Sequence, residues 1–222
     1  MGILEAKGIV KIYNQGKNSE VRALRQVDLD IGQGEWISIM GKSGSGKSTL
    51  LHILGLVDKY TSGSLIFDGQ CVDHLGQNKM ADIRMKKVGF VLQDFGLIWN
   101  MNVFDNIAAP LYLAKTKKNK VKELVHKAAE ELEIEDLLKK RAKELSGGQC
   151  QRAAIARAIV NDPKVIFADE PTGALDKENA ANIMDIFARI KEKGTTIVMV
   201  THDKEISQRA DREITISDGR IM

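Results

Sequence analysis

The sequence predicts an α/β protein with a parallel sheet core, an N-terminal antiparallel β region and an inserted α-helical subdomain. Over residues 164–210, apolar strand-like runs alternate with helical segments, which is typical of a parallel sheet covered by helices. A glycine-rich loop at 41–49 stands between a strand and a helix. Between 94 and 160 the pattern changes to helical spacing. We expect a single domain over 1–222, with its core at 1–93 and 161–222 and the helical subdomain at 94–160.

The individual elements follow from the spacing of apolar residues. The first part of the chain predicts strands at 3–13, 21–31, 35–41, 63–70 and 88–93, with a helix at 46–57. Apolar residues then recur at helical intervals within 115–145: Val121, Leu124, Val125, Ala128, Leu132 and Leu137. The last part predicts strands at 164–169 and 195–202, helices at 178–194 and 204–210, and a hairpin at 212–221.

Charge and composition argue against several classes of protein. The 33 basic and 30 acidic residues are interspersed, a balance that does not indicate a nucleic-acid partner. No apolar run approaches the roughly 18 residues needed to cross a bilayer, and the N-terminus lacks the pattern of a secretory signal. Cys71 and Cys150 do not suggest a disulfide framework, so we expect a reducing, cytosolic setting.

The loop at 41–49 reads GKSGSGKST and is the complete phosphate-binding P-loop. Glycines let successive backbone N–H groups curl around a triphosphate without clashes from Cβ atoms. Lys47 is expected to reach the β and γ phosphates, and the Ser48 hydroxyl to hold Mg²⁺. A glycine turn without this role matches such a pattern only rarely. The residues expected to bind the nucleotide are Gly41, Lys42, Ser43, Gly44, Ser45, Gly46, Lys47, Ser48 and Thr49.

The run VIFADEP ends a buried strand with two acidic residues. Parallel α/β sheets bind their ligands beyond the carboxyl ends of the strands. Asp169 is therefore expected to orient Mg²⁺, directly or through water. Glu170 is placed to accept a proton from, or to align, the water that attacks the γ-phosphate. A strand-ending Asp is often only structural, but a P-loop in the same chain favours the metal site.

Two further polar residues follow buried strands. His202 comes after the strand-like run TTIVMV, at the same expected edge of the sheet, so we expect it to contact the γ-phosphate. Gln93 ends the strand at 88–93. It could bind Mg²⁺ or the attacking water, or it could be only structural, and the sequence favours neither interpretation. The remaining histidines, His52, His74 and His126, are interpreted as structural.

The run LSGGQ at 145–149 places a serine and two glycines at the start of a predicted helix. Such an N-terminus offers backbone N–H groups, a hydroxyl and the positive end of the helix dipole to an anion. The P-loop already holds the phosphates from one side. If a second copy packs head to tail, its Ser146 and Gly148 would cap the γ-phosphate held by the first copy's Lys47. The sequence thus predicts a dimer that closes around two nucleotides and opens on hydrolysis.

With these motifs in place, the chain resembles the ATP-binding cassette (ABC) proteins, specifically their nucleotide-binding subunits, over essentially its whole length. LSGGQ is similar to the family signature, which is more specific than the P-loop. The resemblance implies a P-loop NTPase (RecA-like) fold and an ATPase that uses ATP and Mg²⁺. It also implies roles for single residues: Tyr13 stacks on adenine, Gln93 lies in the loop that joins core and helical subdomain, Asp176 lies in a loop crossing the dimer interface, and His202 is the switch histidine.

The resemblance therefore adds to the site derived from the residues. The catalytic residues are expected to be Glu170, His202 and Gln93, and the metal ligands Ser48, Gln93 and Asp169. Besides the P-loop, the residues expected to contact nucleotide are Tyr13, Ser146, Gly147, Gly148, Gln149 and Asp176.

Within the family, the runs FADEPTGALD and GFVLQDFGLIWNMNVFDNIAAPL resemble a group that serves macrolide export, lipoprotein release and antimicrobial-peptide resistance. Alanine before LD is closer to the peptide-resistance members. Lys42 and Trp99 depart from the group, which often has Pro and a smaller residue there. Cys150 stands where a larger polar residue is common. A thiol in the first turn of a helix can have a lowered pKa, but a small residue that fits is the favoured interpretation.

The resemblance implies a motor subunit that binds a separate integral membrane permease and drives export or extraction at the cytoplasmic face of the membrane. A second hypothesis is a regulatory ABC ATPase that controls a cell-division or cell-wall hydrolase complex and transports nothing. DNA-repair and chromosome ATPases carry long heptad coiled coils, and ribosome-associated factors carry two cassettes. This sequence shows neither feature. The substrate itself stays open, since the permease and not the motor contacts it.

Overall fold

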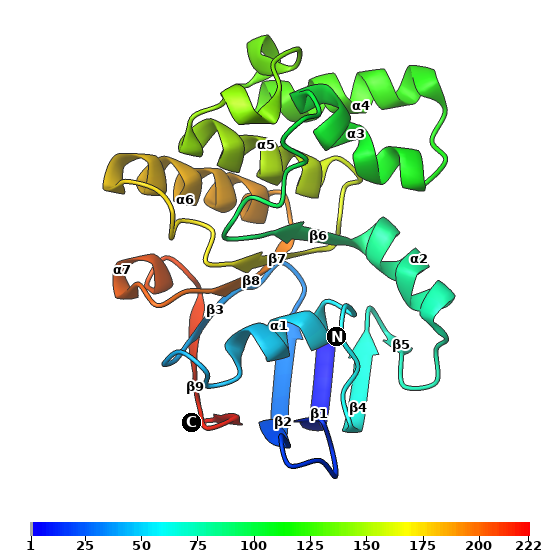
Figure 1. The fold of residues 1–222 in the computed structure, drawn as a ribbon, viewed down its shortest axis with the longest axis vertical. Coiled ribbons are helices and arrows are strands. Elements are labelled where there is room, and N and C mark those ends of the chain that lie inside the picture. Colours follow the sequence, from blue (N-terminus) through cyan, green and yellow to red (C-terminus); the bar gives the residue numbers. More distant parts are fainter. Residues whose placement is uncertain (1) are drawn as a thin grey trace. The chain divides into compact units, whose positions relative to one another are not determined.

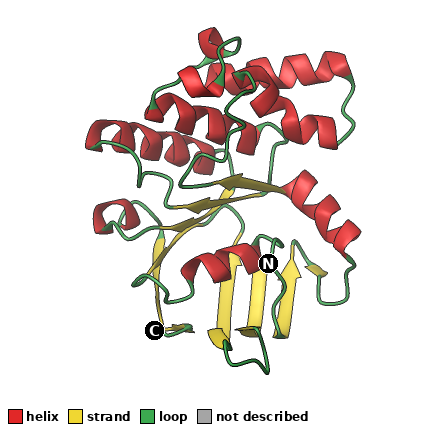
Figure 2. Cartoon of the chain, viewed as in Figure 1, coloured by secondary structure: helices red, strands yellow, loops and turns green. Residues whose placement is uncertain are grey.

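The computed structural model describes residues 2–222 and divides them into two compact units. Unit 1 comprises the chain up to Asp82 together with Thr196–Met222, and unit 2 comprises Ile83–Thr195. Unit 1 is built mainly from strands and unit 2 mainly from helices (Figure 2). Both units hold parallel strands, and unit 1 also holds an antiparallel sheet. The predicted mixed α/β architecture is thereby confirmed.

The antiparallel sheet of unit 1 is formed by the N-terminal part of the chain. Its strands are β1 (Gly2–Tyr13), β2 (Val21–Gly32), β4 (Ser62–Phe67) and β5 (Gln70–Cys71), in the order β2-β1-β4-β5 (Figure 1). Along β2, Val27, Leu29 and Ile31 are buried while the residues between them are exposed. This alternation of period two is the reason that the segment pairs as a half-buried strand.

The second sheet of unit 1 carries the parallel strands. Here β3 (Trp36–Met40) lies between β8 (Thr196–Val200) and β9 (Arg212–Ser217) and runs parallel to both, while β10 (Arg220–Ile221) closes an antiparallel hairpin with β9. Helix α1 (Lys47–Leu54) contacts β1, β2 and β8 through four buried side chains, and the short α7 (Lys204–Ser207) packs on β3. Helix α1 therefore joins the two sheets of this unit.

In unit 2, three helices pack around a fourth, central helix. A short parallel pair, β6 (Val88–Val91) and β7 (Val165–Asp169), accompanies helices α3 (Val103–Leu113), α4 (Lys118–Glu131), α5 (Gly147–Ile159) and α6 (Lys177–Glu192) (Figure 1). The 3₁₀ turns η1 (Glu135–Leu137) and η2 (Ala142–Glu144) connect α4 to α5. Helix α5 contacts α3, α4, α6 and β6, so it forms the core of this unit.

The amphipathic pattern predicted within 115–145 is confirmed, although the segment holds one helix and two 3₁₀ turns. Five of the six apolar residues named for it are buried, and Leu124 is half-buried. Helix α2 (Gln77–Lys87) was not predicted at all. Its only buried residue is Met80, so no apolar stripe marks it in the sequence.

The compact units do not coincide with the predicted division into a core (1–93 and 161–222) and a helical subdomain (94–160). Strands β6 and β7 and helix α6, expected in the core, group with the helices because α5 packs against both β6 and α6. The functional subdomain boundaries therefore stay a prediction.

Candidate nucleotide-binding site

The P-loop connects β3 to α1 within unit 1, as the sequence predicts. Gly46, the residue before α1, has a φ of 108°. A Cβ atom there would lie 2.5 Å from the carbonyl oxygen of Ala23, and one at Gly41 would lie 2.3 Å from that of Ile216. Only glycine fits these two positions, because backbone atoms cannot move aside as a flexible side chain can. The loop backbone is therefore held close against β2 and β9.

Two polar groups of the loop point to a phosphate ligand. The Lys47 ammonium donates to the carbonyl oxygens of Gly41 and Lys42, each at 2.9 Å, so it lies over the loop. The Ser45 hydroxyl is buried, and it has no hydrogen-bond partner among the described residues. A phosphate supplies what both groups lack, namely negative charge for the ammonium and an acceptor for the hydroxyl. These residues therefore fit the nucleotide that the sequence implies.

His202 lies at the same edge of unit 1 as the P-loop. Strands β3 and β8 are parallel, with Ile39 opposite Val200, so Gly41 and His202 both follow the carboxyl ends of neighbouring strands. The intervening Thr201 is buried, and its hydroxyl accepts from the backbone N–H of Asp203. His202 itself is exposed. The strand register is consistent with the expected position of this histidine, and its contact with the γ-phosphate stays a prediction.

Gln93, Asp169 and Glu170 come together in unit 2. Strands β6 and β7 are parallel, with Val91 opposite Ala168, so all three residues follow the same edge of the pair. Glu170 has a φ of 48°, which is uncommon for a residue other than glycine, so the chain turns sharply there. A Cβ atom added at Gly173 would lie 3.5 Å from Gln93 Nε2 and 3.7 Å from Glu170 Cβ, so Gln93 lies beside the Glu170 turn.

The signature serine caps the helix that follows it. The Ser146 hydroxyl accepts from the backbone N–H of Gln149 at 3.4 Å, and the Gln149 side chain accepts from the backbone N–H of Ser146 at 3.0 Å. This capping box satisfies two orphan donors of α5. Ser146 and Gly147 remain exposed. The N-terminus of α5 is thus formed and accessible, as an anion-binding corner requires.

The second signature glycine, Gly148, also has a packing role that the sequence did not show. A Cβ atom at Gly148 would lie 2.7 Å from the Asn179 side-chain oxygen in the first turn of α6. Asn179 in turn donates, through its backbone N–H at 2.8 Å and its side chain at 2.7 Å, to Asp176, which caps α6. The backbone hydrogen bond from Asn179, followed by that from its side chain, lowers the pKa of Asp176. Asp176 therefore stabilises the start of α6, whatever it contributes at a dimer interface.

Tyr13 ends β1 in unit 1, and its hydroxyl donates to Asp58 at 2.8 Å. Burial raises the pKa of Tyr13, and its hydrogen bond to Asp58 adds to this effect, so the phenol stays protonated. Lys11 also contacts this ring, and neither Lys11 nor Asp58 was predicted from the sequence.

Arg157 is a second residue that the sequence analysis missed. From the last turn of α5 its guanidinium donates to the carbonyl oxygens of Phe95, at 2.9 Å, and Gly96. Burial lowers the pKa of Arg157, while the nearby Asp94 acts in the opposite direction. The corner that follows Gln93 is thereby fixed to the helix that begins with the signature. No local pattern reveals a contact across about sixty residues.

Cys150 lies in surroundings that disfavour a reactive thiolate. It is 2% exposed, and burial raises its pKa rather than lowering it. Its sulfur lies 3.7 Å from the carbonyl oxygen of Ala142. The structure therefore favours the interpretation that a small residue fits this position. Cys71, by contrast, is exposed.

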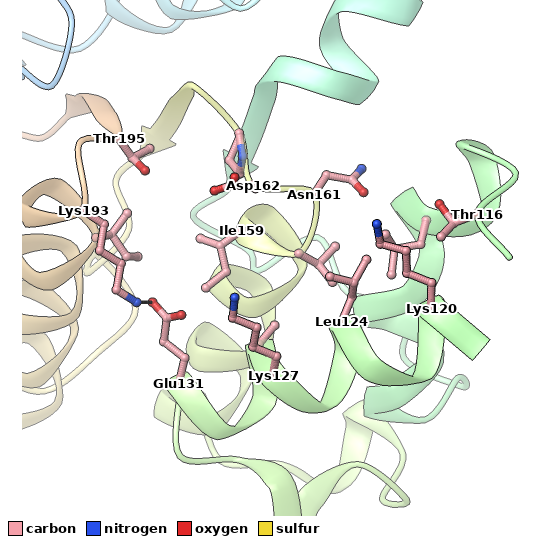
Figure 3. A pocket seen from close by; sticks show the side chains of 15 residues that line it. Thr116, Lys120, Leu124, Lys127, Glu131, Ile159, Asn161, Asp162, Lys193 and Thr195 are labelled. Carbon is pink, nitrogen blue, oxygen red and sulfur yellow. Dashed lines mark hydrogen bonds and ion pairs between the residues drawn. The ribbon is translucent and has the colours of Figure 1, made fainter. Parts of the chain in front are cut away.

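A hollow of about 650 Å³ in unit 2 is not part of the predicted site (Figure 3). Lys120, Leu124 and Lys127 of α4 line one side, and the ion pair between Lys193 and Glu131, at 2.5 Å, lies at another. None of the residues expected to bind nucleotide lines it. We therefore do not place the nucleotide there.

The donor set suits Mg²⁺ held with the help of a nucleotide. Within residues 2–222, no group of three or more His, Cys, Asp or Glu side chains is placed to hold a metal by itself. The expected ligands are a hydroxyl (Ser48), an amide (Gln93) and a carboxylate (Asp169). Mg²⁺ is commonly bound by one or two carboxylates together with substrate phosphates, so such an oxygen set fits this ion.

Comparison with known proteins identifies the family. The family model described as "ABC transporter" matches residues 24–173. The chain is 42% identical to the uncharacterized ABC transporter ATP-binding protein YknY of Bacillus subtilis, covering 99% of this chain and 95% of that protein. It is 41% identical to the lipoprotein-releasing system ATP-binding protein LolD of Aquifex aeolicus, covering 99% and 96%.

Longer proteins and solved structures agree with this result. The chain is 40% identical to the macrolide export ATP-binding/permease protein MacB of Aggregatibacter actinomycetemcomitans, of which it spans 34%. It superposes on the dimeric structure of MJ0796, a bacterial ABC transporter cassette, with a TM-score of 0.90 and 37% identity, covering 98% of this chain and 96% of the other. A structure of the same cassette in a post-hydrolysis state bound to ADP and Pi matches equally well. The chain therefore belongs to the ABC transporter family, as an ATP-binding and ATP-hydrolysing domain.

Proposed function

We propose that the chain is the motor subunit of a membrane exporter or extractor, and that two copies close head to tail around two ATP molecules. The observation that carries this proposal is the pair of phosphate-facing corners: the P-loop that ends in Lys47, and the exposed, capped N-terminus of α5 at Ser146. In the proposed dimer, each nucleotide lies between the P-loop of one copy and the α5 N-terminus of the other, since either element can bind phosphate. The dimeric state of the related cassette MJ0796 supports the arrangement.

Within each composite site, the residues of this chain have separate tasks. Lys47 would neutralise the phosphates. Ser48, Gln93 and Asp169 would hold Mg²⁺, which would supply charge stabilisation for phosphoryl transfer. Glu170 aligns or deprotonates the attacking water, and His202 contacts the γ-phosphate. The partner's Ser146 corner completes the cage, so that hydrolysis would release the dimer.

The permease is proposed to be a separate chain. Among the described residues, no helix is long and apolar enough to cross a bilayer. Ile98, Trp99 and Met101 follow the Gln93 corner and are exposed, which is typical of residues that a partner covers. We place the docking surface there, at the cytoplasmic face of the membrane. Relatives named for macrolide export and lipoprotein release favour transport of a substrate of that kind over the regulatory alternative.

Co-purification from native membranes tests this function. We expect a Glu170→Gln variant, tagged and extracted with Mg²⁺ and ATP, to retain one multi-span membrane protein identified by mass spectrometry. Reconstituting the two in vesicles should stimulate ATP hydrolysis by the wild-type chain. Trp99→Ser should lose this stimulation, whereas Val57→Ser, which changes a similarly exposed apolar residue of unit 1, should keep it. Stimulation that survives Trp99→Ser would move the docking surface elsewhere.

Replacing Ser146 by Ala is expected to slow hydrolysis about 100-fold while leaving the ATP affinity of a single subunit unchanged. The reason is that Ser146 is proposed to contact the nucleotide bound by the other subunit. Each hydrogen-bond donor to the transferring phosphate stabilises the transition state strongly. The matched control is Asn102→Ala, since Asn102 caps α3 through Asp105 in the same way, at 2.6 Å. Both variants should lose about 1 kcal/mol of stability. Equal hydrolysis rates in the two would contradict the role of Ser146.

A further inference from the structure

The ring of Tyr13 is held by a cluster of side chains that includes Lys11 and Asp58, which belong to none of the motifs described above. Its hydroxyl donates to Asp58 Oδ2 at 2.8 Å, and the Thr49 side chain hydrogen-bonds to the same hydroxyl. Asp58 lies in the loop that follows α1, and Thr49 lies within α1 itself. The ring at the end of β1 is therefore tied at its tip to the helix that leaves the P-loop.

Lys11 holds the same ring from one side. Lys11 and Tyr13 are two residues apart on β1, so they point to the same face of the strand. The Lys11 ammonium lies 4.5 Å from the centre of the Tyr13 ring, a cation–π contact. It also donates to Asp58 Oδ1 at 2.8 Å and to the carbonyl oxygen of Lys59 at 2.5 Å. With three partners and a side chain only 11% exposed, this lysine is fixed.

Asp58 is the centre of the cluster. Its carboxylate accepts from the Lys11 ammonium, the Tyr13 hydroxyl and the backbone N–H of Lys59, the last at 2.7 Å. Burial acts to raise the pKa of Asp58, but the hydrogen bonds from Lys11 and Tyr13 outweigh it and hold the pKa below its usual value. The charge of Asp58 is thus maintained at neutral pH, and both oxygens are occupied.

We propose that Lys11 and Asp58 are positioning residues that hold Tyr13 as a platform for the base and tie that platform to the P-loop helix. This rests on the proposed function, in which Tyr13 stacks on adenine. One face of the ring is covered by Lys11, so the base stacks on the other. A ring fixed at its tip and on one face loses little freedom when a base binds, and this preorganisation increases affinity. Lys11 and Asp58 therefore act on base binding and not on phosphate binding.

Binding of ADP and of inorganic pyrophosphate, each with Mg²⁺, separates the two effects in calorimetry, because pyrophosphate has no base. We expect Lys11→Met and Asp58→Asn to weaken ADP binding about tenfold and to leave pyrophosphate binding within about twofold. Tyr13→Phe keeps the ring and removes the tie at its tip, so it should match Asp58→Asn and serves where that variant folds poorly. In a Tyr13→Ala background, Asp58→Asn should have no further effect on ADP.

The control is Asp73→Asn. Asp73 accepts a hydrogen bond from Tyr60 in the same unit, a pair of the same chemistry that includes neither Tyr13 nor Lys11, so this variant should bind both ligands normally. Equal weakening of ADP and pyrophosphate in the Lys11 and Asp58 variants would overturn the positioning role, as would unchanged ADP affinity. A selective loss of ADP affinity in the Asp73→Asn control would also overturn the positioning role. If Tyr13→Ala leaves ADP affinity intact, or the wild-type chain binds neither ligand, the assigned base site or the proposed function fails as well.

Discussion

Replacing Glu170 by Gln is expected to reduce ATP hydrolysis by about 10²- to 10⁴-fold while leaving ATP binding intact. The amide has nearly the same size and shape as the carboxylate, but it cannot accept the proton of the attacking water. Glu170 is suited to this task because β7 is buried up to its last residue and ends in a left-handed corner at Glu170, beside Gln93. Since we propose that hydrolysis opens the dimer, the variant should accumulate as an ATP-bound dimer.

Size-exclusion chromatography with ATP and Mg²⁺ measures this accumulation directly. The variant should elute at twice the mass of the chain, and the wild-type protein should return to the monomer as ATP is consumed. Glu178→Gln, which changes an acidic residue in the first turn of α6, is the matched control and should hydrolyse ATP normally. A variant that remains monomeric with ATP would contradict both the assignment of Glu170 and the dimer itself.

Replacing Lys47 by Ala is expected to weaken ATP binding about 100-fold or more. The Lys47 ammonium is held over the P-loop by the carbonyl oxygens of Gly41 and Lys42, where it is ready to turn toward the phosphates. Hydrogen bonds between an ammonium and phosphate oxygens contribute about 1.5–3 kcal/mol each, and the phosphates keep their charge when the lysine is removed. The variant should therefore lose ATP affinity and not only hydrolysis rate.

Calorimetry with ATP and Mg²⁺ measures this loss on the isolated chain. Lys7→Ala is the control, because Lys7 is an exposed lysine of β1 in the same unit and should leave the affinity unchanged. Melting temperatures of the two variants show whether either change disturbs the fold. Near-normal affinity of a folded Lys47→Ala variant would contradict the assignment of the P-loop.

The sequence alone determined which residues are predicted to form the site, because each motif is a short run whose neighbours are local. A glycine loop between a strand and a helix fixes a phosphate cradle, and the structure places Gly41 and Gly46 where no side chain fits. The same holds at the carboxyl ends of the strands, where register brings His202 to the edge of the P-loop and Gln93 to the edge of Glu170. The helix start at Ser146 was also predicted, while its capping box with Gln149 was found in the structure.

The tertiary structure alone decided which other residues support that chemistry. Arg157 fixes the corner after Gln93, and Gly148 leaves room for Asn179 of α6. Asp58 joins Lys11 and Tyr13, more than forty residues away, into one cluster. Helix α2 and the grouping of α6 with α5 likewise have no local signal. The physical reason is the same in each case: these contacts depend on how distant segments pack, and a polar group finds such a partner only when burial brings the segments together.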